Sequence, residues 1–165
     1  MEKKRLVFFL LIVTIIIACW AGVRFVEKGQ IERRINNGDL LYNMYPVKVY
    51  LRNEFYCVAI FTNSKPVKGA EFSASRQCVF TDCLDLVNIP DIQCYLGKTL
   101  TDIESELGAF HVDMGSGGFM PSYLTEDGYL VIFTVNRSTK VVERVGRIDL
   151  FTSESTEWFL LVEDN

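Results

Sequence analysis

An uncharged run of 18 residues near the amino terminus, at positions 6–23, constrains this chain more than any other feature. Eighteen helical residues span about 27 Å, which is close to the thickness of the hydrocarbon core of a bilayer. Basic residues precede the run, and Trp20 lies near its far end, where an amphipathic ring suits the headgroup region. The run therefore predicts a transmembrane helix that contacts a membrane through residues 6–23. With the basic tail before it, this helix defines an N-terminal part, residues 1–30.

Three fates are open to such a run: a retained anchor, a cleaved secretory signal or a lipidated cysteine. Residues 16–19 (Ile-Ile-Ala-Cys) resemble a bacterial lipobox, which makes Cys19 the candidate lipidation site. No small-x-small cleavage site follows the run, and Trp20 stands where lipoproteins usually carry a small or polar residue. We favour a retained signal anchor, because a short basic tail before the first apolar run is its usual arrangement. The expected location is the cell membrane, single-pass, with the C-terminal domain outside the cytoplasm.

The rest of the chain is acidic. After Gln30 the sequence has 19 acidic and 12 basic residues, so the net charge of this portion is −7. Phosphate backbones repel such a surface, and nucleic acid is therefore excluded as an expected partner. No motif in this portion calls for a cofactor.

A linker or helix at residues 31–45 is expected to join the anchor to a domain at residues 46–165. Residues 47–51 alternate apolar and polar side chains, the pattern of a strand with one solvated face. Residues 55–62 are apolar at both odd and even positions, so both faces of the expected strand are apolar, as in a central strand. Residues 63–69 contain Ser, Pro and Gly and predict a loop, and residues 70–80 predict a third strand.

The second half of the domain begins with the clearest helix signal in the chain. Thr101 with Glu104 three residues later predicts a capping box, and Gly108 lies where the helix must end. Asp127 and Gly128 then form a preferred hairpin turn, followed by strands at 129–135, 140–151 and 158–162. The expected fold class is α+β: an N-terminal transmembrane helix, then one or more antiparallel sheets with a short helix packed on one face.

Segment 97–108 carries Gly-x-Thr, then Asp-Ile, then Leu-Gly. This pattern resembles the motif of SmpA/OmlA and β-lactamase-inhibitor-protein-like domains, and the likeness covers residues 94–151. The resemblance implies a helix that ends in Leu-Gly and leads into a twisted antiparallel sheet. It also permits an immunity or inhibitor function.

Two short segments within the domain have similar sequences. Residues 51–58 (LRNEFYCV) and 124–131 (LTEDGYLV) share Leu, Tyr and Val at an offset of 73. Two weakly similar halves, 46–92 and 93–165, would resemble the two-repeat inhibitor proteins. The alternative is that strands of similar composition agree by chance.

Four cysteines remain beyond Cys19, and an even set in an exported domain is compatible with disulfides, for which three pairings exist. The alternative is four small buried thiols. Their spacing lacks the repeated short intervals of a zinc site, so no metal is expected. The four residues are Cys57, Cys78, Cys83 and Cys94.

Catalytic chemistry has one candidate constellation, because the chain has a single histidine. His111, Asp113 and Ser116 lie within six residues of one another, whereas catalytic triads are assembled from distant elements. The glycines that follow lack the Lys and the helix of a phosphate-binding loop. The segment therefore predicts a surface loop, and we expect no catalytic residues.

Aromatic side chains are the remaining source of function, since exposed Tyr and Phe on a sheet often dominate binding energy. The candidates are Phe119, Tyr123 and Tyr129. We expect a non-catalytic, membrane-tethered extracytoplasmic domain that binds another protein or a component of a bacterial envelope. The binding surface would be the open side of the sheet together with the Gly-rich loop at 112–122. The alternatives are a lipoprotein-type protein, an immunity or inhibitor protein, and an enzyme of unknown type that uses His111 and Asp113.

Overall fold

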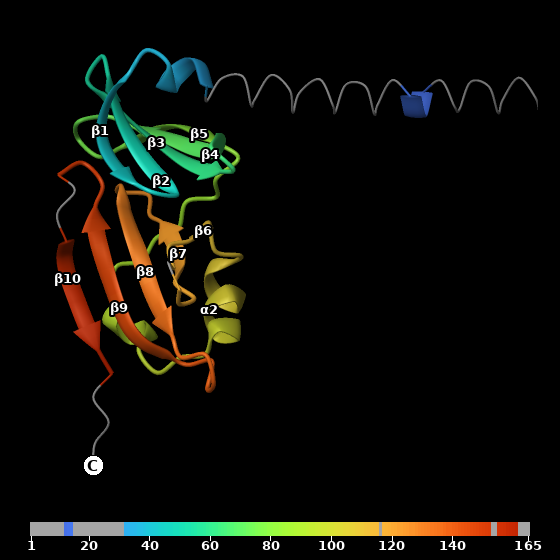
Figure 1. The fold of residues 1–165 in the computed structure, drawn as a ribbon, viewed down its shortest axis with the longest axis vertical. Helices are drawn as coiled ribbons and strands as arrows, with labels where there is room; N and C mark the ends of the chain where they lie inside the picture. Colours follow the sequence, from blue (N-terminus) through green and yellow to red (C-terminus); the bar gives the residue numbers. More distant parts are fainter. Residues whose placement is uncertain (1–11, 15–31, 116, 153–154, 162–165) are drawn as a thin grey trace, which may run out of the picture.

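The computed structural model describes residues 12–14, 32–115, 117–152 and 155–161, and their strands form two five-stranded antiparallel sheets (Figure 1). In each sheet the strands follow one another in chain order, so both are meanders. Sheet 1 contains β1 (Asp39–Met44), β2 (Val47–Arg52), β3 (Phe55–Thr62), β4 (Lys65–Phe72) and β5 (Cys78–Asp82). Sheet 2 contains β6 (Val112–Asp113), β7 (Pro121–Leu124), β8 (Tyr129–Val135), β9 (Val142–Asp149) and β10 (Ser155–Leu160).

Tight turns set the register of sheet 1. Asn53 and Glu54 join β2 to β3, Asn63 and Ser64 join β3 to β4, and all four residues have positive φ, as two-residue hairpin turns of the primed type require. The loop expected at 63–69 is therefore only two residues long. Pro66 is tolerated inside β4 because β5 pairs only with residues 69–72, which leaves the start of β4 at the edge of the sheet.

The two sheets share one hydrophobic core. Sheet 1 lies over one end of sheet 2 (Figure 1), and apolar side chains from both sheets form a single buried cluster. From sheet 1 and the segment after it the cluster takes Val47, Val49, Val58, Ile60, Ala70, Phe72 and Leu84. From sheet 2 and the segment after β9 it takes Val112, Leu124, Leu130, Ile132, Ile148 and Leu150. Because neither sheet can bury this face alone, the two stabilise each other.

The opposite face of sheet 2 is covered by α2 (Leu100–Leu107), by the short helix η1 (Gln93–Tyr95) and by the segment before it. The N-cap of α2 is Thr99, whose side chain accepts from the Asp102 N–H while Asp102 accepts from the Thr99 N–H. The capping box predicted at Thr101 is therefore displaced by two residues. Gly108 ends the helix with a φ of 80°, as expected for a glycine at this position.

The expected fold class, α+β with an N-terminal transmembrane helix, is wrong. The described residues are mostly antiparallel strands, and beyond helical turns at 12–14 and 32–35 their only α-helix is the eight-residue α2. Within the described part no helix is long and apolar enough to cross a membrane, so the transmembrane, single-pass and signal-anchor predictions are not supported. Of the predicted span at 6–23, only residues 12–14 are described, and Cys19 lies outside the described residues.

Candidate functional site

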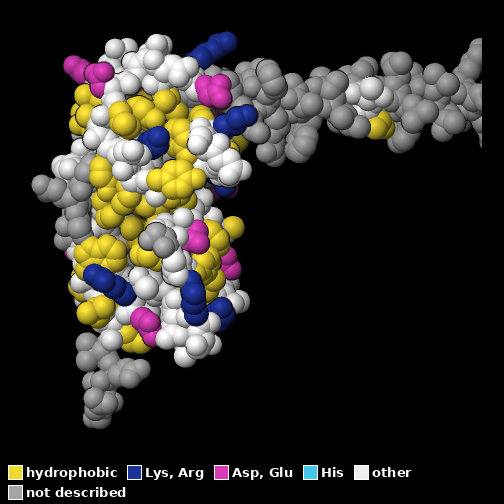
Figure 2. All heavy atoms as spheres, in the orientation of Figure 1, with side chains coloured by type: hydrophobic (Ala, Val, Ile, Leu, Met, Phe, Trp, Pro, Cys, Tyr) yellow, Lys and Arg dark blue, Asp and Glu magenta, His cyan; other side chains and the backbone are white. Residues whose placement is uncertain are grey.

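A broad, open groove with largely apolar walls lies between the two sheets, with a volume of about 700 Å³. One wall comes from sheet 1, at the turn before β2 and the turn between β3 and β4, and the other comes from residues 110–115 around β6. Its apolar lining comprises Tyr45, Pro46, Ile60, Phe61, Val67, Phe110, Val112 and Met114. Figure 2 shows hydrophobic side chains gathered across one face of the molecule where the sheets meet.

Cross-strand pairing fixes the side of sheet 1 to which Lys68 points. Ile60 belongs to the shared core, and Lys68 is its cross-strand partner, so Lys68 points to the same side of sheet 1. Among the described residues that line the groove, Lys68 is the basic one and Asp113 is the acidic one. Asp113 is committed to its own loop, because its Oδ1 accepts from the N–H groups of Gly115 and Met120, both at 2.9 Å.

His111 is a structural anchor at the base of this groove. Its Nε2 lies 2.9 Å from the Asp85 carbonyl and donates to it, while its Nδ1 accepts from the Leu124 N–H at 2.8 Å. Burial lowers the pKa of His111 below its ordinary value of 6.5, so the ring is neutral. Both ring nitrogens are thus engaged by main chain, and Asp113 bonds different partners. This geometry disfavours the enzyme alternative built on these two residues, because no nitrogen is left to move a proton.

We expect His111 to make the domain sensitive to mild acid. Its pKa is lowered in the folded state, so below about pH 6.5 the unfolded chain binds a proton that the folded chain does not. The contribution of the neutral His111 ring to the free energy of unfolding is fully retained above pH 6.5. It is lost as the pH falls towards the folded-state pKa, by up to about 1.4 kcal/mol per pH unit. His111→Gln should flatten the slope between pH 7.5 and pH 5.5, measured by urea denaturation. An equal slope in both proteins would contradict the assignment.

The three aromatic residues predicted to bind partners lie in different environments. Tyr123 is fully buried in the core beneath α2, where its hydroxyl donates to the Gly108 carbonyl at 2.8 Å, so it is not a surface residue. Burial raises its pKa to about 12. Phe119 is half-buried against Phe110, with ring centroids 5.5 Å apart. The guanidinium groups of Arg76 and Arg147 both lie over the ring of Tyr129, at 4.9 and 4.7 Å from its centroid.

None of Cys57, Cys78, Cys83 and Cys94 is joined in a disulfide in this structure, whereas the sequence is compatible with either disulfides or separate thiols. Cys57 is buried, Cys78 is half-buried, and Cys83 and Cys94 are exposed. Burial raises the pKa values of the Cys57 and Cys78 thiols, which disfavours the reactive thiolate at these two positions. The described residues contain no group of three His, Cys, Asp or Glu side chains suited to a metal ion.

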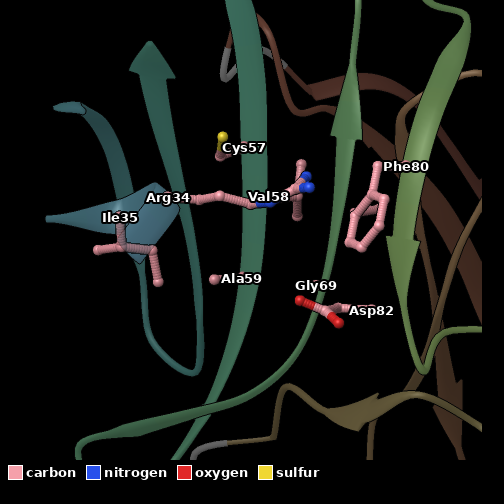
Figure 3. Close-up of a pocket in the computed structure, with 9 residues that line it drawn as sticks. Arg34, Ile35, Cys57, Val58, Ala59, Gly69, Phe80 and Asp82 are labelled. Carbon is pink, nitrogen blue, oxygen red and sulfur yellow. The ribbon is translucent and has the colours of Figure 1, made fainter. Parts of the chain in front are cut away.

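A second hollow lies on the outer face of sheet 1, under the helical turn at 32–35 (Figure 3). Its floor is shallow because Ala59 and Gly69 are cross-strand partners with little or no side chain. Arg34 reaches over it, forms an ion pair with the buried Glu71, and stacks 3.6 Å from the ring centroid of Phe80. The hollow measures about 20 Å³, room for one water molecule, so it serves to seat the turn and not to hold a ligand.

The groove is the site that the sequence did not predict. The Gly-rich loop was expected to bind, but its partners in the opposite wall, Tyr45, Phe61 and Lys68, come from a segment about 50 residues earlier. One signal was present: an aromatic residue directly before Pro46 in a turn, where burial is not expected. No protein-family model, curated protein or solved structure matches this chain, so the likeness to SmpA/OmlA and β-lactamase-inhibitor-protein-like domains stays a prediction from residues 97–108.

Proposed function

We propose that this domain is a non-catalytic binding module whose groove accepts an exposed segment of another protein. The observation that carries the proposal is the groove itself: about 700 Å³, walled by apolar and aromatic side chains, with few polar groups. These are the usual properties of a binding cleft. Tyr45 stands at its margin and is 64% exposed, although a tyrosine in a packed hairpin gains stability from burial.

The charges of the groove indicate what the segment should carry. Lys68 presents an ammonium group to the groove, whereas the Asp113 carboxylate is occupied by two loop N–H groups. A bulky apolar side chain would fill the apolar part, and a neighbouring carboxylate would pair with Lys68. The partner segment is therefore expected to combine a large apolar residue with Asp or Glu. Location outside the cytoplasm and attachment to an envelope component stay predictions from the sequence, and the groove does not depend on them.

Selection from a random peptide library displayed on phage tests this function without knowledge of the natural partner. The unmodified domain should enrich peptides that pair an aromatic or large aliphatic residue with an acidic one. Lys68→Glu should weaken binding of those peptides at least about tenfold, because it places like charges together. Tyr45→Ala should weaken it by removing the aromatic margin.

The matched control is Lys65→Glu. Lys65 is exposed and lies three residues before Lys68 on the same strand, but it does not line the groove. Binding should survive this change with less than a threefold loss. Failure to enrich any common peptide, or equal losses with both lysine variants, would contradict the proposal.

A further inference from the structure

A short strap, residues 32–37, lies on the outer face of sheet 1. It consists of the helical turn at 32–35 and the two residues before Gly38, which immediately precedes β1. The chain approaches the sheet closely at Gly38, because a Cβ there would lie only 3.1 Å from the Cβ of Tyr50. Within the strap Arg34 and Ile35 are half-buried, and the other four residues are exposed. The strap therefore contacts the sheet mainly through these two side chains.

The strap covers apolar side chains that strand pairing alone would leave open to water. Ile35 packs against a buried cluster on this face that comprises Tyr50, Cys57, Ala59 and Phe61. Cys57 is 4% exposed and Ala59 is 1% exposed, and both line the hollow beneath the strap together with Arg34 and Ile35 (Figure 3). Because these two side chains are short and lie on the outer face of the sheet, their burial depends on the strap.

The main-chain hydrogen bonds of the strap are separate from those of the sheet. The N–H groups of Asn36 and Gly38 donate to the carbonyls of Glu32 and Ile35, both at 3.0 Å, so they close the strap on itself. Strands β2, β3 and β4 pair with one another, and the shared core lies on the opposite face of sheet 1. A single helical turn is not stable by itself, and the hollow leaves part of its inner surface without packing partners. Release of the strap therefore breaks side-chain contacts and leaves the sheet paired.

Arg34 is the latch that holds the strap closed. Its guanidinium forms an ion pair with Glu71 on β4 and lies 3.6 Å from the ring centroid of Phe80 on β5. Arg52 on β2 also lies 3.5 Å from the Glu71 carboxylate, and it stays with the sheet when Arg34 leaves. Glu71 thus keeps a cation in the open state, so opening avoids the large cost of a buried charge without a partner.

We infer that the strap opens as a unit while both sheets stay folded, and that its opening exposes the Cys57 thiol to solvent. Segments that open in this way are held by few buried contacts, as the strap is by Arg34 and Ile35. The strap is therefore a gate over the outer face of sheet 1, and it opens without a partner in the groove.

Alkylation of Cys57 by iodoacetamide, followed by mass spectrometry, measures the opening. In the full chain, serine replaces the other four cysteines, which are Cys19, Cys78, Cys83 and Cys94. Because the reagent reacts slowly, the rate reports the fraction of molecules in which Cys57 is accessible. Without urea the protein should be labelled at least about tenfold faster than global unfolding, measured by urea denaturation, allows. A rate equal to that limit would overturn the inference.

Three variants distinguish opening of the strap from global unfolding. Arg34→Ala should raise the labelling rate at least about tenfold, whereas Arg33→Ala, at the exposed neighbour on the same turn, should change it less than about threefold. Ile132→Val removes a methyl group from the shared core and should lower the urea midpoint, but the labelling rate should stay the same because Ile132 does not contact the strap. Equal rates for the two arginine variants, or acceleration by Ile132→Val that matches its loss of stability, would overturn the inference.

Discussion

Phe72→Ala should lower the free energy of unfolding by about 3–5 kcal/mol, because it removes a large side chain from the core that joins the two sheets. Phe72 is fully buried, and its ring meets that of Phe151, which lies between β9 and β10 of sheet 2, edge to face with centroids 5.7 Å apart. The matched control is Val79→Ala on β5 of the same sheet, where the side chain is 53% exposed. That change should alter stability by no more than about 0.5 kcal/mol.

The same variant tests whether the sheets unfold together. In a Trp20→Phe background, Trp158 is the only tryptophan and reports on sheet 2, whereas Phe72 belongs to sheet 1. Because the core is shared, Phe72→Ala should shift the urea midpoint of Trp158 fluorescence as far as that of far-ultraviolet circular dichroism. A fluorescence midpoint that stays in place would mean that sheet 2 is stable by itself.

Arg76→Ala should cost about 2–3 kcal/mol, because it leaves the carboxylate of Asp149 buried without its cation. Arg76 comes from the turn before β5 in sheet 1, and Asp149 lies at the end of β9 in sheet 2 with 5% exposure. The guanidinium also stacks on Phe151 at 4.8 Å. The Arg76 side chain itself is about one-third exposed, so water can enter part of the space that it leaves. The loss of stability should therefore be smaller than for a fully buried ion pair.

Arg147→Ala is the control for this ion pair. Arg147 stacks on Tyr129 as Arg76 does, but its partner Glu157 is 39% exposed, so the loss of Arg147 should cost no more than about 1 kcal/mol.

The pH dependence of stability provides a second test of the Arg76–Asp149 ion pair. Burial alone would raise the pKa of Asp149, but the hydrogen bonds from Arg76 and from the Phe151 N–H hold it below its ordinary value of 3.8. The stabilisation is therefore present above pH 3.8 and is lost as the pH falls through the folded-state value. Chemical denaturation of both variants from pH 7 to pH 3 would show it, and equal effects of the two arginines would contradict this role.

The sequence predicts local elements well where pattern and turn chemistry agree. The strand expected at 55–62 is β3, the turn at Asp127 and Gly128 is present, and the strand expected at 129–135 is β8. In each case an apolar run is bounded by residues that favour a turn, and no distant contact is needed to decide it.

Errors arose where two local signals competed or where distant contacts decide. Thr99 and Thr101 both offer a cap, and Thr99 is the cap because Asp102, at the third position, completes the reciprocal bonds. Tyr123 was expected to be a binding residue, yet it lies in the core formed with α2 and is fully buried. The groove could not be predicted, since its walls meet only after sheet 1 packs on sheet 2. Periodicity gives the faces of each sheet but not which faces meet.

The central claim is that the groove between the sheets holds a partner segment, and site-directed photocrosslinking tests it most directly. A benzophenone amino acid would replace Tyr45 in the full chain, or Leu40 as the control outside the groove, and each protein would be irradiated with the peptide selected from the library. We predict a covalent adduct from position 45 that Lys68→Glu largely abolishes, and little adduct from position 40. No adduct from position 45, or equal adducts from both positions, would contradict the account.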